Sequence, residues 1–360
     1  MTAPFFQSPD RSRAHVLFVY RNFAAIENPN CQSHVGLGVN VLHSIRVLRR
    51  HGVDAYGRGV WTVEHVRAAL AAYPQTTHLV CEAPWIEAPD VARLISEYPD
   101  VHFLIRSHSQ IGFLQVEAGA IHTIRDLMLL QDGALNLSVA SNSKRLKHYL
   151  ERTYNGGCVF LPNLYDIERV HRKRDLSHTR GLVRIGSFGA IRILKNHSSA
   201  AAAAMLIAKS RGVDLEFHIS VNREEGGNGV VDALRAMFKD VPWARLIESP
   251  WQDWAKFRRL VAYMDLNLQA SLTETFNIVS ADSTAEGVPC VVTPMIEWAP
   301  RYWQVDPDDI EQMARVGNQL LSSIDGAEDG LEALTCYVRD AVRRWLAYLD
   351  GAPSAFKIDV

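Results

Sequence analysis

The sequence lacks the long apolar runs that mark membrane proteins and the leader that marks secreted ones. Its longest apolar helix candidate, residues 200–208, is far too short to span a bilayer. The apolar run at residues 14–20 is typical of a first β-strand and not of the core of a signal peptide. We therefore expect a cytoplasmic protein without a membrane span.

Cysteines are few, and their spacing suits neither zinc nor a disulfide framework. The five are widely separated and lie mostly within apolar runs: Cys31, Cys81, Cys158, Cys290 and Cys336. The sequence contains no CxxC pair and no Cys/His cluster with zinc spacing, so we expect no metal site. Buried free thiols in a reducing compartment are the simpler interpretation.

The sequence also lacks an excess of charge of one sign. Its 38 Lys and Arg residues face 40 Asp and Glu residues, for a net charge of -2. This balance argues against a protein that binds polyanions over its whole surface. The charge is unevenly spread, however: residues 144–180 hold nine basic and four acidic side chains, whereas residues 305–332 hold eight acidic side chains and one arginine.

Several catalytic motifs are absent from the sequence. It has no Gly-Lys-Ser/Thr phosphate loop, no serine nucleophile elbow and no HExxH pair. Gly36 and Gly38 follow the first predicted strand, where glycines let a ligand approach the backbone closely before a helix begins. A dinucleotide fingerprint requires a third glycine, but position 41 is Val41. The pattern therefore argues against NAD.

What the sequence does contain is a regular alternation of apolar strands and amphipathic helices. At about 150 residues per domain, 360 residues predict two domains. Continuous apolar strands separated by helices are typical of parallel sheets covered on both faces. The predicted strands are 15–20, 55–60, 77–81, 101–105, 135–140, 158–161, 182–187, 215–221, 245–247, 265–269 and 290–293. We therefore expect an α/β protein with two doubly wound, Rossmann-like domains.

A polar stretch without apolar periodicity predicts where the two domains join. We expect an N-terminal domain over residues 1–168, a linker over 169–180 and a C-terminal domain over 181–330. Residues 331–360 contain a last helix with no strand after it, which could pack back on the N-terminal domain.

The segment that follows the predicted strand 265–269 is the most informative. Glu274 precedes a predicted helix, Asp282 comes eight positions later, and a Gly-Val-Pro turn leads into the next strand. Carboxylates so placed can accept hydrogen bonds from sugar and ribose hydroxyls, and the free N–H groups at a helix start favour a diphosphate. The pattern resembles the signature of retaining GT-B glycosyltransferases of glycosyltransferase family 4. Asn277 stands where that family usually has Gly, and Asp282 where it usually has Glu.

A second segment, residues 183–197, resembles the same family. A strand ends in a loop that contains Gly189, Arg192 and Lys195, and a helix starts directly afterwards. In the family, an Arg and a Lys at this place neutralise the donor diphosphate. Their usual separation is five positions and here it is three, and Ser187 occupies the commoner Arg position.

A third resemblance lies in the first half of the chain. The buried strand 101–105 delivers Arg106 and His108 to its C-terminal tip. In the family, a His after the corresponding strand faces the sugar from the acceptor side, and a Gly-rich loop, here with Gly36 and Gly38, borders sugar and acceptor. The resemblance thus implies a functional His108.

Taken as a whole, the resemblance implies a GT-B fold with two domains facing each other across a cleft, and a retaining, metal-independent transferase. The donor would be a nucleotide-diphosphate sugar, with UDP- or GDP-sugars favoured, and no other cofactor is expected. Arg192 and Lys195 would stabilise the leaving diphosphate, Glu274 would orient the sugar and Asp282 would hold the ribose. The helix start that assists them comprises Thr275, Phe276, Asn277 and Ile278.

The acceptor is left open by the sequence. A glycan or another carbohydrate hydroxyl is favoured. The basic stretch Lys144–Arg180 supports an alternative, a nucleic-acid acceptor such as the hydroxylated bases of phage-type modified DNA, in the host cytoplasm if the protein is phage-encoded. The departures at Asn277 and Asp282 and the altered Arg/Lys spacing support two others: a GT-B-like nucleotide-sugar binding protein without turnover, and an epimerase of the same fold.

Overall fold

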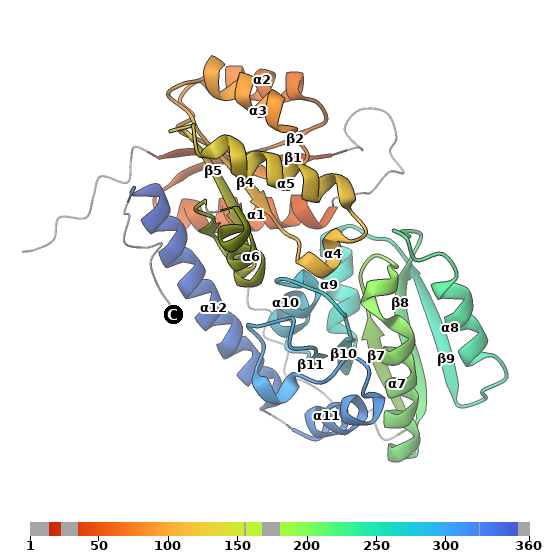
Figure 1. Cartoon of the computed structure of the whole chain (residues 1–360). Coiled ribbons are helices and arrows are strands. Elements are labelled where there is room, and N and C mark those ends of the chain that lie inside the picture. The colour runs from red at the N-terminus through yellow and green to blue at the C-terminus, as the bar shows by residue number, and fades with distance from the viewer. Residues whose placement is uncertain (1–13, 23–34, 155, 168–180, 324, 352–360) are drawn as a thin grey trace, which may run out of the picture. The chain divides into compact units, whose positions relative to one another are not determined.

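The computed structural model describes residues 14–22, 35–154, 156–167, 181–323 and 325–351 (Figure 1). The chain divides into two compact units. The first comprises residues 1–166 together with 338–360, and the second comprises residues 167–337. Among the described residues, no helix combines the length and the apolar character that crossing a membrane requires.

The first unit is built on a six-stranded, wholly parallel sheet in the order β2-β1-β3-β4-β5-β6. The strands are β1 (His15–Arg21), β2 (Asp54–Val60), β3 (His78–Glu82), β4 (His102–Ser107), β5 (Leu137–Ser141) and β6 (Val159–Phe160). The strand order reverses between β1 and β3, so a topological switch point lies between these two neighbouring strands. Side chains that follow β1, β3 and β4 therefore gather at one end of the sheet.

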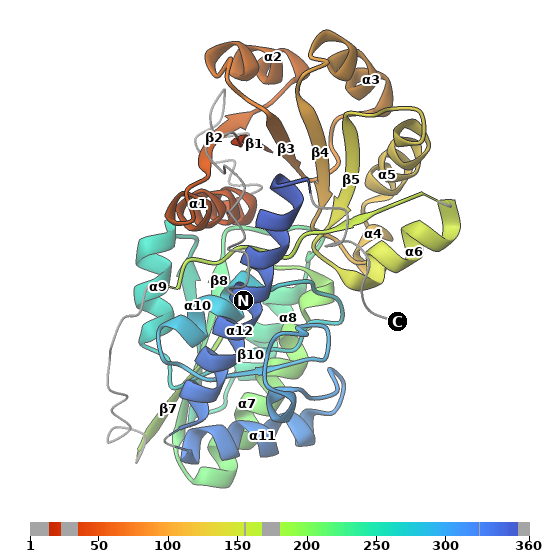
Figure 2. The ribbon, with the colours of Figure 1, turned by 90° about the vertical axis from the view of Figure 1, so that its left-hand side faces the viewer.

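Helices cover both faces of this sheet (Figure 2). One face, with Leu17 and Val19, packs against α2 (Val63–Ala72), α3 (Ala88–Glu97), α4 (Ile111–Leu114), α5 (Ala118–Gln131) and α6 (Lys144–Tyr154). The other face, with Val16 and Phe18, packs against α1 (Val35–Arg50) and the last turns of α12 (Gly326–Leu349). All four of these strand residues are fully buried, which explains why β1 reads as a continuous apolar run.

Trp345 of α12 completes the core of the first unit. Its ring lies 5.8 Å from that of Phe18, it is fully buried, and its indole N–H donates to the carbonyl of Pro162 over 2.8 Å. Residues near the C-terminal end of the described chain thus pack in the same core as the first strand. Burying a tryptophan removes a large apolar area from water and contributes strongly to stability.

The second unit is built on a five-stranded parallel sheet in the order β11-β10-β7-β8-β9. The strands are β7 (Leu182–Ser187), β8 (Asp214–Val221), β9 (Ala244–Pro250), β10 (Leu266–Gln269) and β11 (Cys290–Val292). The order reverses between β7 and β10. The loops that leave these two strands therefore diverge and leave room for a ligand at the carboxyl end of the sheet.

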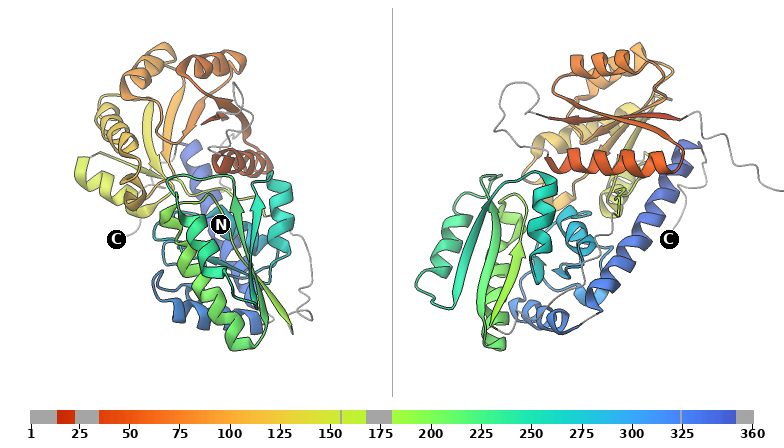
Figure 3. Two further views of the ribbon diagram at one scale, coloured as in Figure 1. Left: turned by 90° about the vertical axis from the view of Figure 1, so that its right-hand side faces the viewer. Right: turned by 180° about the vertical axis from the view of Figure 1, so that it is seen from behind.

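The crossovers place α7 (His197–Arg211) and α8 (Val230–Phe238) on one face of this sheet, and α9 (Trp254–Ala262) and α10 (Ile278–Ala285) on the other (Figure 3). The alanines 200, 201, 203 and 204 of α7 are fully buried, and α11 (Ile310–Ser322) packs closely on that helix. Gly317 of α11 makes this possible, because a Cβ there would lie 2.5 Å from Ile207. Two short 3₁₀ turns, Ile193–Lys195 and Arg301–Trp303, complete the unit.

The two parallel sheets confirm the predicted α/β class. The strand expected at 182–187 has the observed bounds, and the other predicted strands differ from the observed ones by one to three residues at their ends. The last helix begins at Gly326 rather than at residue 331. The predicted linker, residues 169–180, lies outside the described residues.

Candidate functional site

The loops after β7 and β10 bring the predicted donor residues of the second unit together. Lys195 ends the 3₁₀ turn that follows β7, and Glu274 lies in the loop between β10 and α10. The two loops are joined by a backbone hydrogen bond of 2.9 Å from the N–H of Leu272 to the carbonyl of Leu194. They flank the switch point between neighbouring strands, which is where open α/β sheets bind ligands.

At this place the Lys195 ammonium forms an ion pair with Glu274 Oε1. Both side chains are 14% exposed, so the pair is largely withdrawn from water. Two mostly buried charges need a close partner to offset the loss of hydration, and here each supplies the other. Gly189, also predicted for this loop, has φ +120° and lies beside the Lys195 side chain, which a Cβ would approach to 3.6 Å.

Arg192 is held by a different carboxylate, Glu225 of the loop after β8. Its Nε donates to Glu225 Oε2 over 2.6 Å, and Arg223 Nε donates to Oε1 of the same carboxylate over 2.7 Å. Burial acts to raise the pKa of Glu225, but the charges of Arg192 and Arg223 outweigh it and lower that pKa. Two guanidinium groups thus share one carboxylate, so these three side chains together carry one positive charge.

Backbone hydrogen bonds also join the loop after β7 to the loop after β8. The N–H of Ile191 donates to the carbonyl of Arg223 and the N–H of Glu225 donates to the carbonyl of Ile191, both over 2.9 Å. Gly227 packs on this bridge, since a Cβ there would lie 2.5 Å from the carbonyl oxygen of Ile191. The loop after β8 therefore fixes the position of Arg192.

Asn277 caps the N-terminus of α10 in a left-handed backbone conformation, with φ 55°. Its Oδ1 accepts from the backbone N–H of Ser280 over 2.9 Å, and its Nδ2 donates to Gln269 Oε1 over 3.0 Å. Glycine and asparagine are the residues that adopt this region most readily. This conformation explains how asparagine can replace the usual glycine, and its side chain adds a cap that glycine lacks.

The residues beside this cap are packed into the second unit. The carbonyl of Phe276 accepts from the Trp298 indole N–H over 2.7 Å, and the Phe276 ring stacks on Tyr337 at 5.2 Å. Thr275 precedes it in the loop, and Ile278 is the first residue of α10. The helix start that was predicted to assist the donor residues is therefore anchored by contacts of Phe276 within the second unit.

Asp282 lies on α10 and is 1% exposed. The indole N–H of Trp254, the first residue of α9, faces both of its oxygens at 3.2 and 3.1 Å. Arg258 lies over the Trp254 ring at 5.3 Å and pairs with Glu286 over 2.6 Å. Asp282 therefore joins α10 to α9, a contact that its spacing from Glu274 does not predict.

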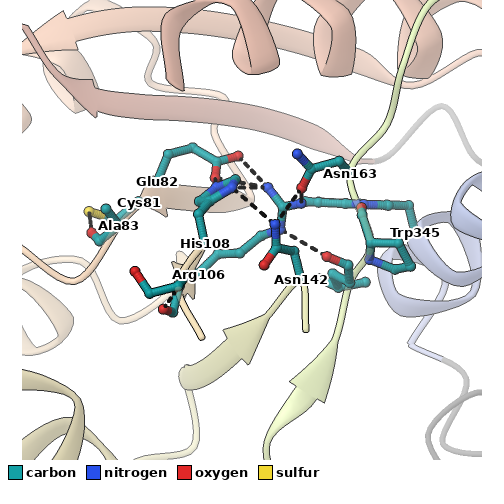
Figure 4. Close-up of polar contacts among 12 residues, drawn as sticks. Cys81, Glu82, Ala83, Arg106, His108, Asn142, Asn163 and Trp345 are labelled. Atoms are coloured by element: carbon teal, nitrogen blue, oxygen red, sulfur yellow. Dashed lines mark hydrogen bonds and ion pairs between the residues drawn. The ribbon is translucent and has the colours of Figure 1, made fainter. Parts of the chain in front are cut away.

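In the first unit, the carboxyl ends of β3 and β4 carry a second group of buried polar side chains (Figure 4). Glu82 and Arg106 face each other in the register of the two strands, and both side chains are fully buried. Arg106 Nη1 donates to the two oxygens of Glu82 over 3.0 and 2.8 Å, and His108 Nε2 contacts Glu82 Oε2. The His108 side chain is 14% exposed, so it is the member of this trio with access to solvent.

Two asparagines extend this network. Arg106 Nη2 donates to Asn163 Oδ1 over 2.7 Å, and Asn142 Nδ2 donates to the same oxygen over 3.0 Å. The backbone next to Glu82 is strained, because Ala83 has φ 80°, a conformation that a residue with a Cβ seldom adopts. Strain of this kind persists where the surrounding structure overdetermines it, often at functional sites.

The predicted glycines of the first unit lie inside α1 rather than in a loop before it. This helix begins at Val35, so Gly36 and Gly38 belong to its first turn. A Cβ at Gly38 would lie 3.1 Å from the Tyr20 ring of β1, whereas nothing lies within 4 Å of one at Gly36. The expectation that the helix starts after them is wrong, and residues 23–34, which precede it, lie outside the described residues.

The structure thus places Gly189, Arg192, Lys195, Glu274, residues 275–278 and Asp282 in the second unit, and Gly36, Gly38 and His108 in the first. Sequence reasoning missed Glu82 and Glu225, the carboxylates that hold the predicted cations. A charged residue directly after the apolar run 78–81 was the available signal for Glu82.

Part of the basic stretch is described. In α6, Lys147 pairs with Glu151 over 2.5 Å and Lys144 lies 5.7 Å from the centre of the Phe160 ring. Residues 155 and 168–180 of this stretch lie outside the described residues. Binding of nucleic acid by this stretch stays a prediction. Among the side chains that the structure describes, no group of three or more His, Cys, Asp or Glu residues is placed to hold a metal ion.

No protein-family model and no curated protein sequence matches the chain. Solved structures do match its fold. A variant of S. aureus TarM, with UDP and α-GlcNAc-glycerol bound, is 13% identical at a TM-score of 0.58 over 79% of this chain, which spans 58% of TarM. Anabaena HepE in complex with UDP-glucose is 13% identical at a TM-score of 0.64, over 94% of this chain and 99% of HepE.

A UDP-forming α,α-trehalose-phosphate synthase from Burkholderia xenovorans is likewise 13% identical, at a TM-score of 0.61 over 93% of this chain and 98% of the synthase. At this level of identity the comparisons show the fold alone. They confirm the predicted GT-B fold, the fold of nucleotide-sugar glycosyltransferases.

Proposed function

We propose that the chain is a retaining glycosyltransferase that moves a sugar from a nucleotide-diphosphate sugar to a hydroxyl of a carbohydrate acceptor. The observation that carries this proposal is the ion pair of Lys195 with Glu274 at the switch point of the second sheet. It places a cation and a carboxylate beside the start of α10, in a fold whose solved examples bind UDP and UDP-glucose.

The charges around this pair suit a leaving diphosphate. Lys195 and Glu274 together carry no net charge, whereas Arg192 and Arg223 around Glu225 carry one positive charge. A donor diphosphate would compete with Glu274 for the Lys195 ammonium, and the backbone N–H groups at the start of α10 would add further donors. Stabilising the charge that grows on the leaving group is the strongest catalytic effect that such a site can supply.

The two carboxylates would bind different parts of the donor. Once Lys195 turns to the diphosphate, Glu274 is available to accept hydrogen bonds from sugar hydroxyls. We assign Asp282 to the ribose. Its two oxygens, which face the Trp254 indole N–H, would also accept hydrogen bonds from the ribose hydroxyls. His108 of the first unit would contact the sugar or the acceptor. Retention would follow from attack on the same face of the sugar, assisted by the leaving phosphate.

Donor binding is tested first, by thermal shift of the purified protein with UDP-, GDP-, ADP- and TDP-sugars. A donor that binds only the folded chain raises the melting temperature in proportion to the logarithm of its concentration over Kd. We expect a UDP- or GDP-sugar to give the largest shift. No shift with any of these donors at millimolar concentration would contradict the proposal.

Turnover is then measured as release of nucleoside diphosphate with that donor, with and without carbohydrate acceptors. We expect Lys195→Ala and Glu274→Ala each to lower kcat by about a hundredfold or more. The matched control is Lys209→Ala, an exposed lysine at the end of α7, which should leave kcat unchanged. Wild-type rates in both site variants would refute the roles given to these residues. Binding without turnover would instead favour the binding-protein alternative.

A further inference from the structure

The polar network of the first unit contains one group that can only donate hydrogen bonds, Arg106. A guanidinium has five N–H donors and no acceptor, and it stays protonated in proteins. Arg106 is fully buried and donates to Glu82, to Asn163 Oδ1 and, through Nε, to the carbonyl of Leu161 over 3.0 Å. Each hydrogen-bond partner of Arg106 must therefore present an acceptor, and this requirement passes along the network.

One branch runs through the two asparagines to His108. Because Asn163 must present Oδ1 to Arg106, the side chain of Asn142 must present its Nδ2 to that same oxygen, 3.0 Å away. The Asn142 Nδ2 also lies 3.4 Å from His108 Nδ1. An amide nitrogen can only donate, so His108 Nδ1 has to carry a lone pair and not a proton.

The other branch runs through Glu82. Arg106 keeps this fully buried residue as a carboxylate: burial acts to raise the pKa of Glu82, but the charge of Arg106 and the hydrogen bonds from Arg106 and His108 outweigh it and lower that pKa. A carboxylate only accepts, so His108 Nε2, which contacts Glu82 Oε2, has to be the nitrogen that carries the proton. Arg106 Nη1 lies 3.2 Å from His108 Nε2 because both nitrogens direct an N–H group at Glu82 Oε2, and this separation is not a hydrogen bond between them. The two branches leave Arg106 in different directions and require the same tautomer at His108.

The charge state follows from the same surroundings. Burial lowers the pKa of His108, and the neighbouring charge of Arg106 lowers it further, against the opposing effect of Glu82. Two charged groups of the described chain, Glu82 from β3 and Arg106 from β4, contact the ring. The backbone holds them in place, because the N–H of the strained Ala83 donates to the carbonyl of Arg106 over 2.9 Å.

We propose that Glu82, Arg106, Asn142 and Asn163 are positioning residues that lock His108 as the neutral imidazole with its proton on Nε2. For the proposed function, on which this consequence rests, the lock defines what His108 offers a substrate. A sugar or acceptor hydroxyl meets the lone pair of Nδ1, whose contact to Asn142 is at the long limit of a hydrogen bond. His108 therefore accepts a hydrogen bond from a hydroxyl and does not act as a general acid.

The lock is tested by nitrogen-15 NMR of the ligand-free protein labelled at histidine. The resonances of His108 are assigned by their loss in His108→Gln. Protonated and unprotonated ring nitrogens have well-separated shifts, so one spectrum at pH 7 reports both the tautomer and the charge. We expect a protonated Nε2 and an unprotonated Nδ1. An imidazolium, or a proton on Nδ1, would overturn the proposal.

A variant that exchanges one hydrogen-bond donor for an acceptor tests whether Asn142 sets the protonation of His108. Asn142→Asp replaces the donor that faces His108 Nδ1 by an acceptor, so Nδ1 should become protonated at pH 7. The matched control, Gln75→Glu, makes the same amide-to-carboxylate change at an exposed position of the first unit and should leave the His108 resonances unchanged. An Nδ1 shift that is unchanged in folded Asn142→Asp protein would refute the part played by Asn142.

These measurements use no sugar and no acceptor, so their outcome is independent of whether the chain transfers sugar. A confirmed tautomer with no turnover would contradict the proposed function alone. Turnover in a protein whose His108 is an imidazolium would contradict the lock alone.

Discussion

Lys195 and Glu274 form an ion pair although 79 positions separate them in the sequence. Their loops leave two neighbouring strands, β7 and β10, from which the chain runs in opposite directions across the sheet. The relationship ties the geometry of the proposed donor site to the stability of the second unit, so both can be probed with the same substitutions.

The coupling between these two residues can be measured by a double-mutant cycle in urea unfolding. Lys195→Ala and Glu274→Ala each leave a largely buried charge without its partner, so each should lower the free energy of unfolding by about 2–4 kcal/mol. The double variant should lose less than the sum, with a coupling energy of about 1–3 kcal/mol. The exposed pair Lys256 and Asp253 is the control, and its coupling should stay below about 1 kcal/mol. Additive losses at Lys195 and Glu274 would contradict the ion pair.

The left-handed cap of α10 predicts an order of stability among substitutions of Asn277. Asn277→Ala loses the cap to Ser280 and places a Cβ at φ 55°, which should lower the free energy of unfolding by about 2–3 kcal/mol. Asn277→Gly loses the cap but adopts this conformation freely, so its loss should be about 1 kcal/mol or less. Chemical denaturation of both variants checks the order. An alanine variant as stable as the glycine variant would show that the conformation carries no strain.

His197 predicts a loss of stability in acid. Burial, together with the charge of Lys195, lowers its pKa to about 4, whereas an unfolded histidine has a pKa of about 6.5. Between these values the unfolded chain binds a proton that the folded chain does not, so the free energy of unfolding falls as the pH decreases through this window. From this residue alone the loss should reach about 2 kcal/mol at pH 5.

The difference between two variants isolates this effect. In His197→Asn the free energy of unfolding should fall less between pH 7 and pH 5 than in the wild type, by about 2 kcal/mol. His122→Asn replaces an exposed histidine of α5 and should keep the wild-type slope. Equal slopes in all three proteins would show that His197 takes up its proton equally well in the folded chain.

The strained turn after β3 predicts a stabilising substitution. Ala83 has φ 80°, which costs a residue with a Cβ about 1–2 kcal/mol, and glycine removes most of that strain. After subtracting the larger entropy of an unfolded glycine, Ala83→Gly should raise the free energy of unfolding by about 0.5–1 kcal/mol. Ala68→Gly, at an exposed position within α2, should lower it by a similar amount. A loss in both variants would contradict the strain.

The spacing of apolar residues and the polar or turn residues between apolar runs were sufficient to predict the two parallel sheets. Buried parallel strands appear in the sequence as continuous apolar runs. The same patterns placed Lys195 and Glu274 in separate loops but did not predict their contact. That contact depends on which strands are neighbours, and no local pattern records the order β11-β10-β7-β8-β9. The GT-B fold was predicted from a resemblance of motifs and not from periodicity.

The partners of the predicted cations were missed for the same reason. Glu82 faces Arg106 through the register of β3 and β4, and Glu225 reaches Arg192 through a bridge between two loops. Each carboxylate lies 24 or more positions from its partner in the chain. Asn277 shows the opposite case: its departure from the usual glycine is explained by one local backbone angle.

The placement of Trp345 in the core that packs on β1 has a consequence for the order of folding during synthesis. A ribosome makes residues 167–337 before it makes Trp345, so the second unit can close its own core while the first still lacks a fully buried side chain. The unit whose strands emerge first is therefore the last to be completed. Until then α12 does not cover the apolar face around Phe18. A chain that ends before Val338 would leave that face exposed and prone to aggregation.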